Sequence, residues 1–235
     1  RFLRDQLDDP AADDCGRCDN CTGTCVDGRV DAAAVAEARR ALRGAVVVVE
    51  PRKQWPRGLE GRRGNIPPQL RAEEGRALAF GNDPGWSEVL APLLAAADAP
   101  PDDELLRGVA ACLKAWPWGR RPEWVTWVPS RSRPRLVEGL AARLAEVGRM
   151  ELVEAVRRVR IDAPPQERME NSATQAANVL DAFAFGRVGG GELPVGPGLV
   201  VDDTLRSGWT MTVVAEGLRS AGSGLILPFV LWRRP

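Results

Sequence analysis

Predicted strands alternate with predicted helices through the second half of the chain, and this alternation constrains the fold more than any other feature. Apolar runs rich in Val, Leu and Trp predict the strands, and amphipathic stretches with helical periodicity predict the helices. The strands are expected at residues 124–128, 198–201 and 225–231, and the helices at 134–147, 172–185 and 210–221. Because strands separated by helices usually pair in parallel, residues 119–235 are predicted to form a Rossmann-like α/β domain.

The first half of the chain has a different order of elements. Residues 31–42 are rich in Ala and predict a helix, and the β-branched run at 45–50 predicts a strand whose partner is 75–80. A long connection rich in Pro, Gly and Arg joins the two strands. The two helices expected after them are 86–96 and 102–116. We therefore predict a small α+β connecting module over residues 31–118.

Composition excludes several classes of site. The 235 residues include no histidine, which rules out Ser-His-Asp and Cys-His catalysis and histidine-ligated metals within this chain. Thirty-two basic side chains balance thirty-two acidic ones, so the net charge favours neither nucleic acid nor membrane. No apolar run reaches the roughly 18 residues of a membrane span and no signal peptide opens the sequence. We expect a cytoplasmic protein with no membrane partner, whose cysteines are thiols or metal ligands.

Four cysteines lie within eleven residues, in the run CGRCDNCTGTC: Cys15, Cys18, Cys21 and Cys25. Thiolates two residues apart can point at one ion from a tight turn, a spacing found in both zinc and iron–sulfur sites. Zinc is favoured, because Val26 replaces the proline that follows a ferredoxin-type run and the chain has no ligands for a second cluster. The fifth cysteine, Cys112, lies in an apolar helical stretch and is expected to pack in the core.

The segment RFLRDQLDD followed by CGRCDNC resembles the zinc-binding segment that follows the motor of RecQ-family DNA helicases. The resemblance covers about 25 residues and implies a helix at 1–7 and a zinc-binding segment over 1–30. It assigns Cys15, Cys18 and Cys21 as three ligands and leaves the fourth as Cys25 or a position upstream of Arg1. For the whole protein it implies ATP-driven 3′ to 5′ DNA unwinding by an upstream motor in the same polypeptide. This chain has no G-x-x-x-x-G-K-[ST] loop, so it is not expected to hydrolyse ATP by that route.

Basic side chains gather between residues 39 and 76, where ten basic residues face four acidic ones. Together with Trp55, which is expected to be exposed, they suit a nucleic-acid strand, with charges on phosphates and a ring on a base. The alternative is a solvated arginine surface. The residues predicted to contact DNA are Arg52, Lys53, Arg57, Arg62 and Arg63. RecQ enzymes usually carry a winged-helix domain after the zinc segment, so residues 31–118 are by analogy a candidate winged-helix-like DNA contact.

Residues 198–210 read GLVVDDTLRSGWT, an apolar run, two acids and a small-residue turn entering a helix. A carboxylate pair at a strand end can bind ribose hydroxyls, while backbone N–H groups of the turn and the helix start can hold a phosphate. The segment resembles the motif with which type I phosphoribosyltransferases bind phosphoribosyl diphosphate (PRPP). The resemblance implies a ribose site at Asp202 and Asp203 and a Mg²⁺ ion that bridges ribose and diphosphate oxygens. The 5′-phosphate would be held by Thr204, Arg206, Ser207, Gly208, Trp209 and Thr210.

Other segments agree with this resemblance in order. Residues 124–135 look like the strand and diphosphate loop of the family, in which Ser130, Arg131, Ser132 and Arg133 would face the diphosphate. Residues 166–185 are similar to ComF-type relatives. Two positions depart from the family pattern: Arg206 replaces a usual Thr, and Trp209 replaces a small residue and would cover or fill the site.

Both resemblances together predict the C-terminal accessory region of a RecQ-like helicase, nucleoid-associated, that binds zinc and DNA and carries a PRPP- or nucleotide-binding domain. The alternative is an active phosphoribosyltransferase or PRPP hydrolase fused to a helicase. A third hypothesis, a protein-docking scaffold, uses tryptophans as interface anchors. Its candidates are Trp116, Trp118, Trp124 and Trp127. Their positions at strand faces and a helix end favour core packing over docking.

Overall fold

The computed structural model describes residues 6–8, 16–23, 29–160 and 171–234, and divides the chain into two units, Arg1–Arg39 and Arg40–Pro235. The first unit contains the short helix α2 (Asp19–Thr22) and most of α3 (Ala32–Arg43). The helix expected at 1–7 falls mostly outside the described residues, of which 6–8 form a turn. Among the described residues, no helix has the length and apolar character that crossing a membrane would require.

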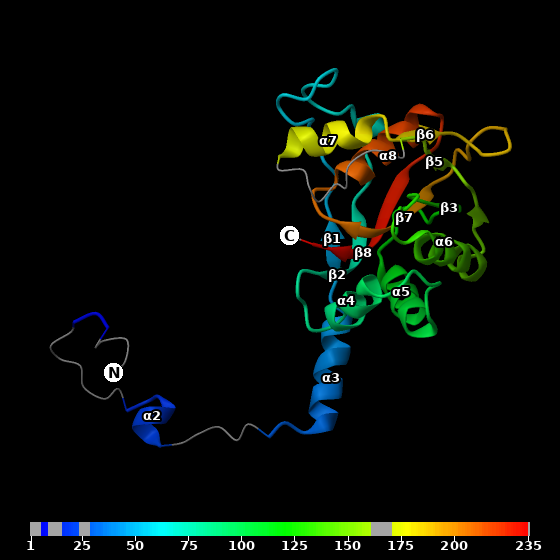
Figure 1. Cartoon of the computed structure of the whole chain (residues 1–235). Helices are drawn as coiled ribbons and strands as arrows, with labels where there is room; N and C mark the ends of the chain where they lie inside the picture. Colours follow the sequence, from blue (N-terminus) through cyan, green and yellow to red (C-terminus); the bar gives the residue numbers. More distant parts are fainter. Residues whose placement is uncertain (1–5, 9–15, 24–28, 161–170, 235) are drawn as a thin grey trace. The chain divides into compact units, whose positions relative to one another are not determined.

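A six-stranded sheet organises the second unit (Figure 1). Its order is β1-β2-β8-β7-β3-β4, and every neighbouring pair is parallel except β1 and β2. The strands are β1 (Val47–Val49), β2 (Gly75–Phe80), β3 (Trp124–Trp127), β4 (Glu151–Leu152), β7 (Gly198–Leu205) and β8 (Ile226–Arg233). The central strands are buried along nearly their whole length, as parallel strands covered on both faces require. The predicted α/β class with a mostly parallel sheet is confirmed.

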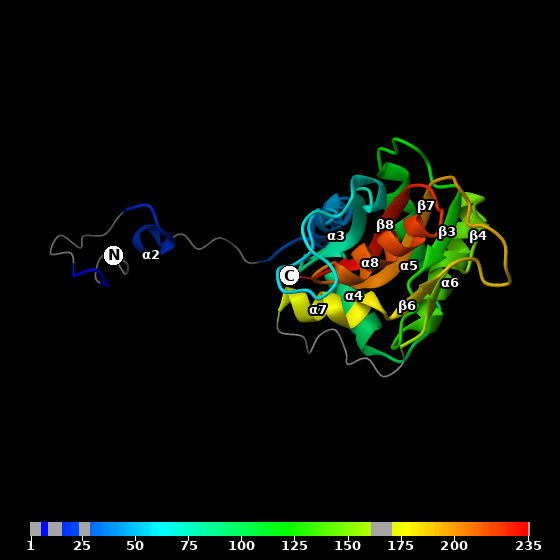
Figure 2. The same cartoon turned by 90° about the horizontal axis from the view of Figure 1, so that it is seen from above.

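Helices cover both faces of the sheet, as Figures 1 and 2 show. Alternate residues of β7 divide between two hydrophobic clusters: Val200 packs with α7 (Ser172–Leu180) and α8 (Trp209–Ser220), whereas Leu199 and Val201 pack on the other side. The helices on that other side are α4 (Ser87–Ala95), α5 (Asp103–Ala115) and α6 (Pro134–Gly148). The carboxyl ends of β3 and β7 are thereby held by packing from both sides.

The predicted connecting module over 31–118 is corrected by the topology. Strand β2 pairs with β8 in parallel, from Arg76 opposite Phe229 to Phe80 opposite Arg233, so the first two strands belong to the same sheet as residues 124–233. The physical reason is burial: β2 is covered along five of its six residues, and an independent two-stranded unit cannot bury both faces. Strands on both sides of the domain boundary expected at residue 118 therefore belong to one sheet. The analogy with a separate winged-helix domain is not retained.

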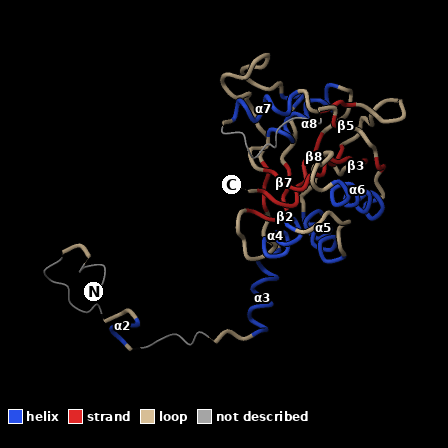
Figure 3. Tube along the Cα trace, viewed as in Figure 1, coloured by secondary structure: helices blue, strands red, loops and turns tan. Residues whose placement is uncertain are grey.

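A second, two-stranded sheet replaces the end of the helix expected at 172–185. Helix α7 ends at Leu180, and β6 (Phe183–Phe185) pairs antiparallel with β5 (Val156–Arg158). The apolar residues of 183–185 fit a helical face or a strand equally well, so periodicity alone misassigned them. The ring of Phe185 packs so closely on α8 that a Cβ on Gly217 would lie 2.1 Å from it. Residues 166–170 of the ComF-like segment lie outside the described residues. Figure 3 shows these short strands beside the large sheet.

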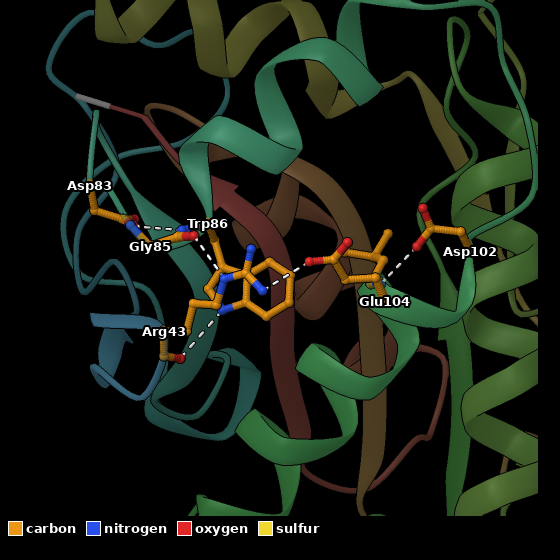
Figure 4. Close-up of polar contacts among 7 residues, drawn as sticks. Arg43, Asp83, Gly85, Trp86, Asp102 and Glu104 are labelled. Atoms are coloured by element: carbon orange, nitrogen blue, oxygen red, sulfur yellow. Dashed lines mark hydrogen bonds and ion pairs between the residues drawn. The ribbon is translucent and has the colours of Figure 1, made fainter. Parts of the chain in front are cut away.

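Arg43, at the end of α3, is anchored to the starts of α4 and α5 (Figure 4). Its Nε donates to the carbonyl of Gly85 at 3.1 Å, and its guanidinium lies 4.5 Å from the Trp86 ring and pairs with Glu104. The Trp86 indole donates back to the Arg43 carbonyl at 3.3 Å. Asp83 accepts hydrogen bonds from the backbone N–H groups of Gly85 and Trp86, which holds the entry to α4 in place.

The tryptophans expected in the core are found there. Trp124 is buried in the cluster that contains Val200. Trp116 is buried in the other cluster, and Trp118 and Trp127 are half-buried against that one. This arrangement supports core packing over the docking hypothesis. Cys112 also packs against that cluster, where burial raises the pKa of its thiol to about 11.

Candidate functional site

Two acidic side chains lie at the carboxyl end of β7, inside a strand longer than the one predicted. The sequence placed the end of the strand at 201, but β7 continues to Leu205 because it pairs with β8 as far as Arg233. Asp202 is buried and Asp203 half-buried, and both line a cavity of about 630 Å³. The cavity lies where ligands bind in parallel sheets, beyond the strand ends. It is lined by Val128, Pro129, Ser130, Arg131, Ser132, Arg158, Asp202, Asp203, Thr204, Leu205, Arg206, Ser207, Gly208, Thr210 and Met211.

Ser130 connects the loop after β3 to the acidic pair. Its hydroxyl donates to Oδ2 of Asp203 at 3.1 Å and accepts a hydrogen bond from the backbone N–H of Arg133, also at 3.1 Å. The two loops that the sequence assigned to diphosphate and to ribose are therefore brought together. A single hydroxyl fixes the position of one carboxylate relative to the start of α6.

Burial governs the charge of the acidic pair. Desolvation raises the pKa of Asp202 well above its ordinary value and the adjacent Asp203 charge raises it further, while the backbone N–H of Asp203 and the charge of Arg158 oppose the rise. The pKa of Asp203 is also raised by burial, against the hydrogen bonds from Ser130 and Thr204. A cation or a hydroxyl donor placed beside the pair would relieve this unfavourable concentration of negative charge.

Arg158 is a cavity residue that the sequence reading missed. It comes from β5, donates twice to the carbonyl of Pro129 at 3.2 and 3.0 Å, and lies 4.6 Å from the centre of the Phe183 ring. Burial and the nearby charge of Arg131 lower its pKa, while Asp202 raises it. The apolar residues within 152–156 (LVEAV) were the available signal, but the segment was interpreted as a polar stretch.

The loop at 205–208 leads directly into α8. Gly208 caps the helix with φ of 78°, a left-handed conformation that a side chain would strain. The first turn of α8 contains no acidic residue, so its backbone N–H groups present the positive end of the helix dipole. Thr204, Arg206, Ser207, Gly208 and Thr210 all line the cavity, as predicted from the motif. The arrangement suits a phosphate at the start of the helix.

Two predicted cavity residues turn their side chains elsewhere. The Trp209 ring is 1% exposed and packs in the core, so it neither covers nor fills the cavity. The Arg133 guanidinium donates to the carbonyls of Leu94 and Ala96 at the end of α4, although its charge still lowers the pKa of Asp203. Their side-chain roles in phosphate binding are therefore corrected. Arg131 and Ser132 both line the cavity and are exposed, and their role in binding diphosphate stays a prediction.

The basic segment departs from the predicted open DNA surface. Trp55, expected to be exposed, is 7% exposed and stacks on Trp209. Arg52 lies over the Trp209 ring and donates to the carbonyl of Ser207, and Arg62 lies over the Trp55 ring and pairs with buried Glu216. These contacts pack the segment against α8 and the loop that precedes it. The predicted DNA-contacting side chains that remain exposed are Lys53, Arg57, Arg62 and Arg63.

Two of the four predicted metal ligands are described. Cys18 precedes α2 and Cys21 lies within it, and their Sγ atoms are 3.3 Å apart. Two sulfurs bound tetrahedrally to one zinc ion at about 2.3 Å each lie about 3.8 Å apart, so the separation of this pair is close to, but shorter than, that of two zinc ligands. Cys15 and Cys25 lie outside the described residues. Within those residues, no three acidic or cysteine side chains converge on one point.

Comparisons of the chain with protein-family models, with curated proteins and with solved structures found no match.

Proposed function

We propose that the Arg40–Pro235 unit binds PRPP or a closely related phosphorylated ribose. One observation carries this proposal: a carboxylate pair of one buried and one half-buried aspartate, a Ser-Arg-Ser loop and a helix start that lacks acidic side chains line one cavity of about 630 Å³. Carboxylates accept hydrogen bonds from vicinal hydroxyls, and helix N-termini favour phosphate. The cavity volume lies in the range of small-molecule sites.

Each group has a distinct part in this proposal. Asp202 and Asp203 accept hydrogen bonds from the ribose hydroxyls, and the N–H groups around Gly208 hold the 5′-phosphate. Arg131, with the backbone of its loop, neutralises the diphosphate. The carboxylate pair also has the oxygen donors that Mg²⁺ prefers, and a bound Mg²⁺ ion would neutralise charge on the diphosphate oxygens. Ser130 positions Asp203.

Phosphoribosyl transfer is a second proposal for the same cavity. The observation in its favour is that Trp209 turns away from the cavity, which leaves the loop backbone accessible to a phosphate. In such a reaction the C1–oxygen bond to diphosphate breaks as an acceptor, or water, bonds to C1. Release of diphosphate from PRPP in the presence of Mg²⁺ tests it, and no release with water, amines or bases would exclude it.

For the molecule as a whole we propose the C-terminal accessory region of a RecQ-like 3′ to 5′ helicase. The close approach of Cys18 and Cys21 supports a zinc-binding segment, and exposed basic side chains at Lys53, Arg57 and Arg63 support DNA contact. Replacing both Arg57 and Arg63 by Ala should weaken DNA affinity at low salt, independently of sequence. Equal affinity in the variant and the parent chain would exclude this surface.

Calorimetric titration of PRPP with Mg²⁺ tests the principal proposal. The double variant Asp202→Asn with Asp203→Asn should lose binding, because neutral amides bind Mg²⁺ more weakly than carboxylates do and accept weaker hydrogen bonds from hydroxyls. The matched control is Asp181→Asn with Glu192→Gln, which removes two negative charges from exposed positions. Absence of heat in the parent chain, or equal binding by the acidic-pair variant, would overturn the proposal.

A further inference from the structure

A second cavity, of about 600 Å³, shares residues 205–208 and Met211 with the first and has no other lining residue in common with it. Its remaining walls come from the end of β1, the segment that follows β1, and β8. Four basic side chains line it: Arg52, Lys53, Arg206 and Arg233. The one acidic lining residue is Glu50. The cavity therefore carries an excess of positive charge.

Contacts within the protein itself hold two of these cations, Arg52 and Arg233, in place. The Nε atom of Arg52 donates to the Ser207 carbonyl at 2.6 Å, and its guanidinium lies 4.2 Å from the centre of the Trp209 ring. Arg233 donates from one terminal nitrogen to the Val48 carbonyl at 2.7 Å and lies 5.3 Å from the Phe80 ring. Partial burial lowers the pKa of Arg52, as expected for a cation with reduced hydration. Fixed, partly desolvated guanidinium groups bind phosphates with little ordering cost.

The size and lining of the cavity indicate the class of ligand. It is far larger than a free phosphate needs, and its volume matches sites that enclose a small organic molecule. Apolar side chains form part of the wall, among them Val49, Ala72, Met211 and Pro228. A ligand with an apolar face would pack against these side chains, and its phosphates would bind the four basic side chains.

We propose that this second cavity binds a nucleotide-sized phosphate ester, separately from the site at Asp202 and Asp203. The lack of a carboxylate pair among its lining residues distinguishes its chemistry from that of the first cavity. The inference goes beyond the PRPP-binding proposal. The two cavities share the loop at 205–208, which holds the 5′-phosphate in that proposal, but Asp202 and Asp203 line only the first cavity, so variants of this pair separate the two proposals.

Calorimetry with ADP on the whole chain tests the inference, with inorganic diphosphate and adenosine as separate arms. ADP should bind more tightly than either fragment, because phosphate and apolar walls both contribute. Lys53→Glu should weaken ADP binding at least tenfold, since it reverses an exposed charge at the cavity wall. Lys114→Glu makes the same substitution at an exposed position on α5, outside both cavities, and should change affinity less than twofold.

A second pair of variants locates the ligand. Lys53→Gln removes the charge without reversing it and should weaken ADP binding by a smaller factor. Asp202→Asn with Asp203→Asn should leave ADP binding within threefold while PRPP binding is lost. No ADP binding to the parent chain would overturn the inference, as would ADP binding that depends on the acidic pair. A failure of PRPP to bind while the ADP results hold would reject only the PRPP proposal.

Discussion

The indole rings of Trp55 and Trp209 stack with centroids 5.9 Å apart and planes 13° from parallel. Arg52 lies over the Trp209 ring, and Arg62 lies over the Trp55 ring. The two stacked rings, each with a cation over it, thus hold the connection between β1 and β2 against the first turn of α8. The same first turn borders both cavities, so this stack supports the loop on which both proposals depend.

Replacing Trp55 by Ala should destabilise the fold by about 3–5 kcal/mol, the usual cost of truncating a buried aromatic side chain. Trp55→Phe retains a ring and should cost less. Urea denaturation followed by circular dichroism measures both variants. A loss below about 1 kcal/mol in the Ala variant would show that the stack contributes little to stability.

Arg62→Gln should destabilise the fold by about 1–3 kcal/mol, because it leaves the buried Glu216 carboxylate without its cation. The range is kept low because Arg62 itself is 44% exposed and screened by water. The double variant with Glu216→Gln should recover part of the loss. Additive effects in this double-mutant cycle would contradict a direct pair.

Asp202→Asn should stabilise the folded chain at neutral pH by about 0.5–2 kcal/mol, the range of substitutions that relieve an unfavourable group. Because the native pKa of Asp202 is raised, the native state binds more protons than the unfolded state between 3.8 and that raised value. Stability therefore falls as the pH rises through this interval. Thermal unfolding at several pH values should show the gain shrinking toward pH 3.8. A gain independent of pH would contradict this origin.

Gly75→Ala tests whether β2 belongs to the large sheet. A Cβ at this position would lie 2.4 Å from the carbonyl oxygen of Pro228 in β8, so the two strands would have to separate. We expect a loss of about 1–3 kcal/mol in the free energy of unfolding. Gly119→Ala is the control, because a Cβ there meets nothing within 4 Å. Equal effects of the two substitutions would contradict the close approach of β2 and β8.

Cys18→Ser with Cys21→Ser should abolish zinc binding, since hydroxyls at these positions replace two thiolate ligands. Metal analysis of the purified chain measures the zinc content. Cys112→Ser is the control, because Cys112 packs against the hydrophobic core and is remote in sequence from the other cysteines. Full zinc content in the double variant would exclude Cys18 and Cys21 as zinc ligands.

The large strands, their parallel order and the acidic cavity were predictable because each depends on a local pattern. Residues 198–210 contain the apolar strand, the two carboxylates and the start of the helix within thirteen consecutive positions. Arg158 was not predictable in the same way. It reaches the cavity only through the pairing of β5 with β6, which joins residues nearly thirty positions apart.

The two largest errors share a physical cause. Trp55 was expected on the surface because its neighbours are basic, and nothing local reveals that Trp209 stacks on it from 154 positions away. The first two strands were assigned to a separate module because the pairing of β2 with β8 is equally remote in sequence. Contacts between residues far apart in the sequence decide whether the arginines of such a segment are exposed to water or packed against aromatic side chains.

The position of β8 has a consequence for biosynthesis. This strand is the last of those described to leave the ribosome, yet it lies in the middle of the sheet between β2 and β7. Without β8 the sheet consists of two fragments, the pair β1–β2 and the group of β7, β3 and β4, each with an edge that lacks its partner strand. Nascent chains stalled before residue 226 should therefore engage chaperones that recognise unpaired strands, and release of the final strand should join the two fragments in a single late step.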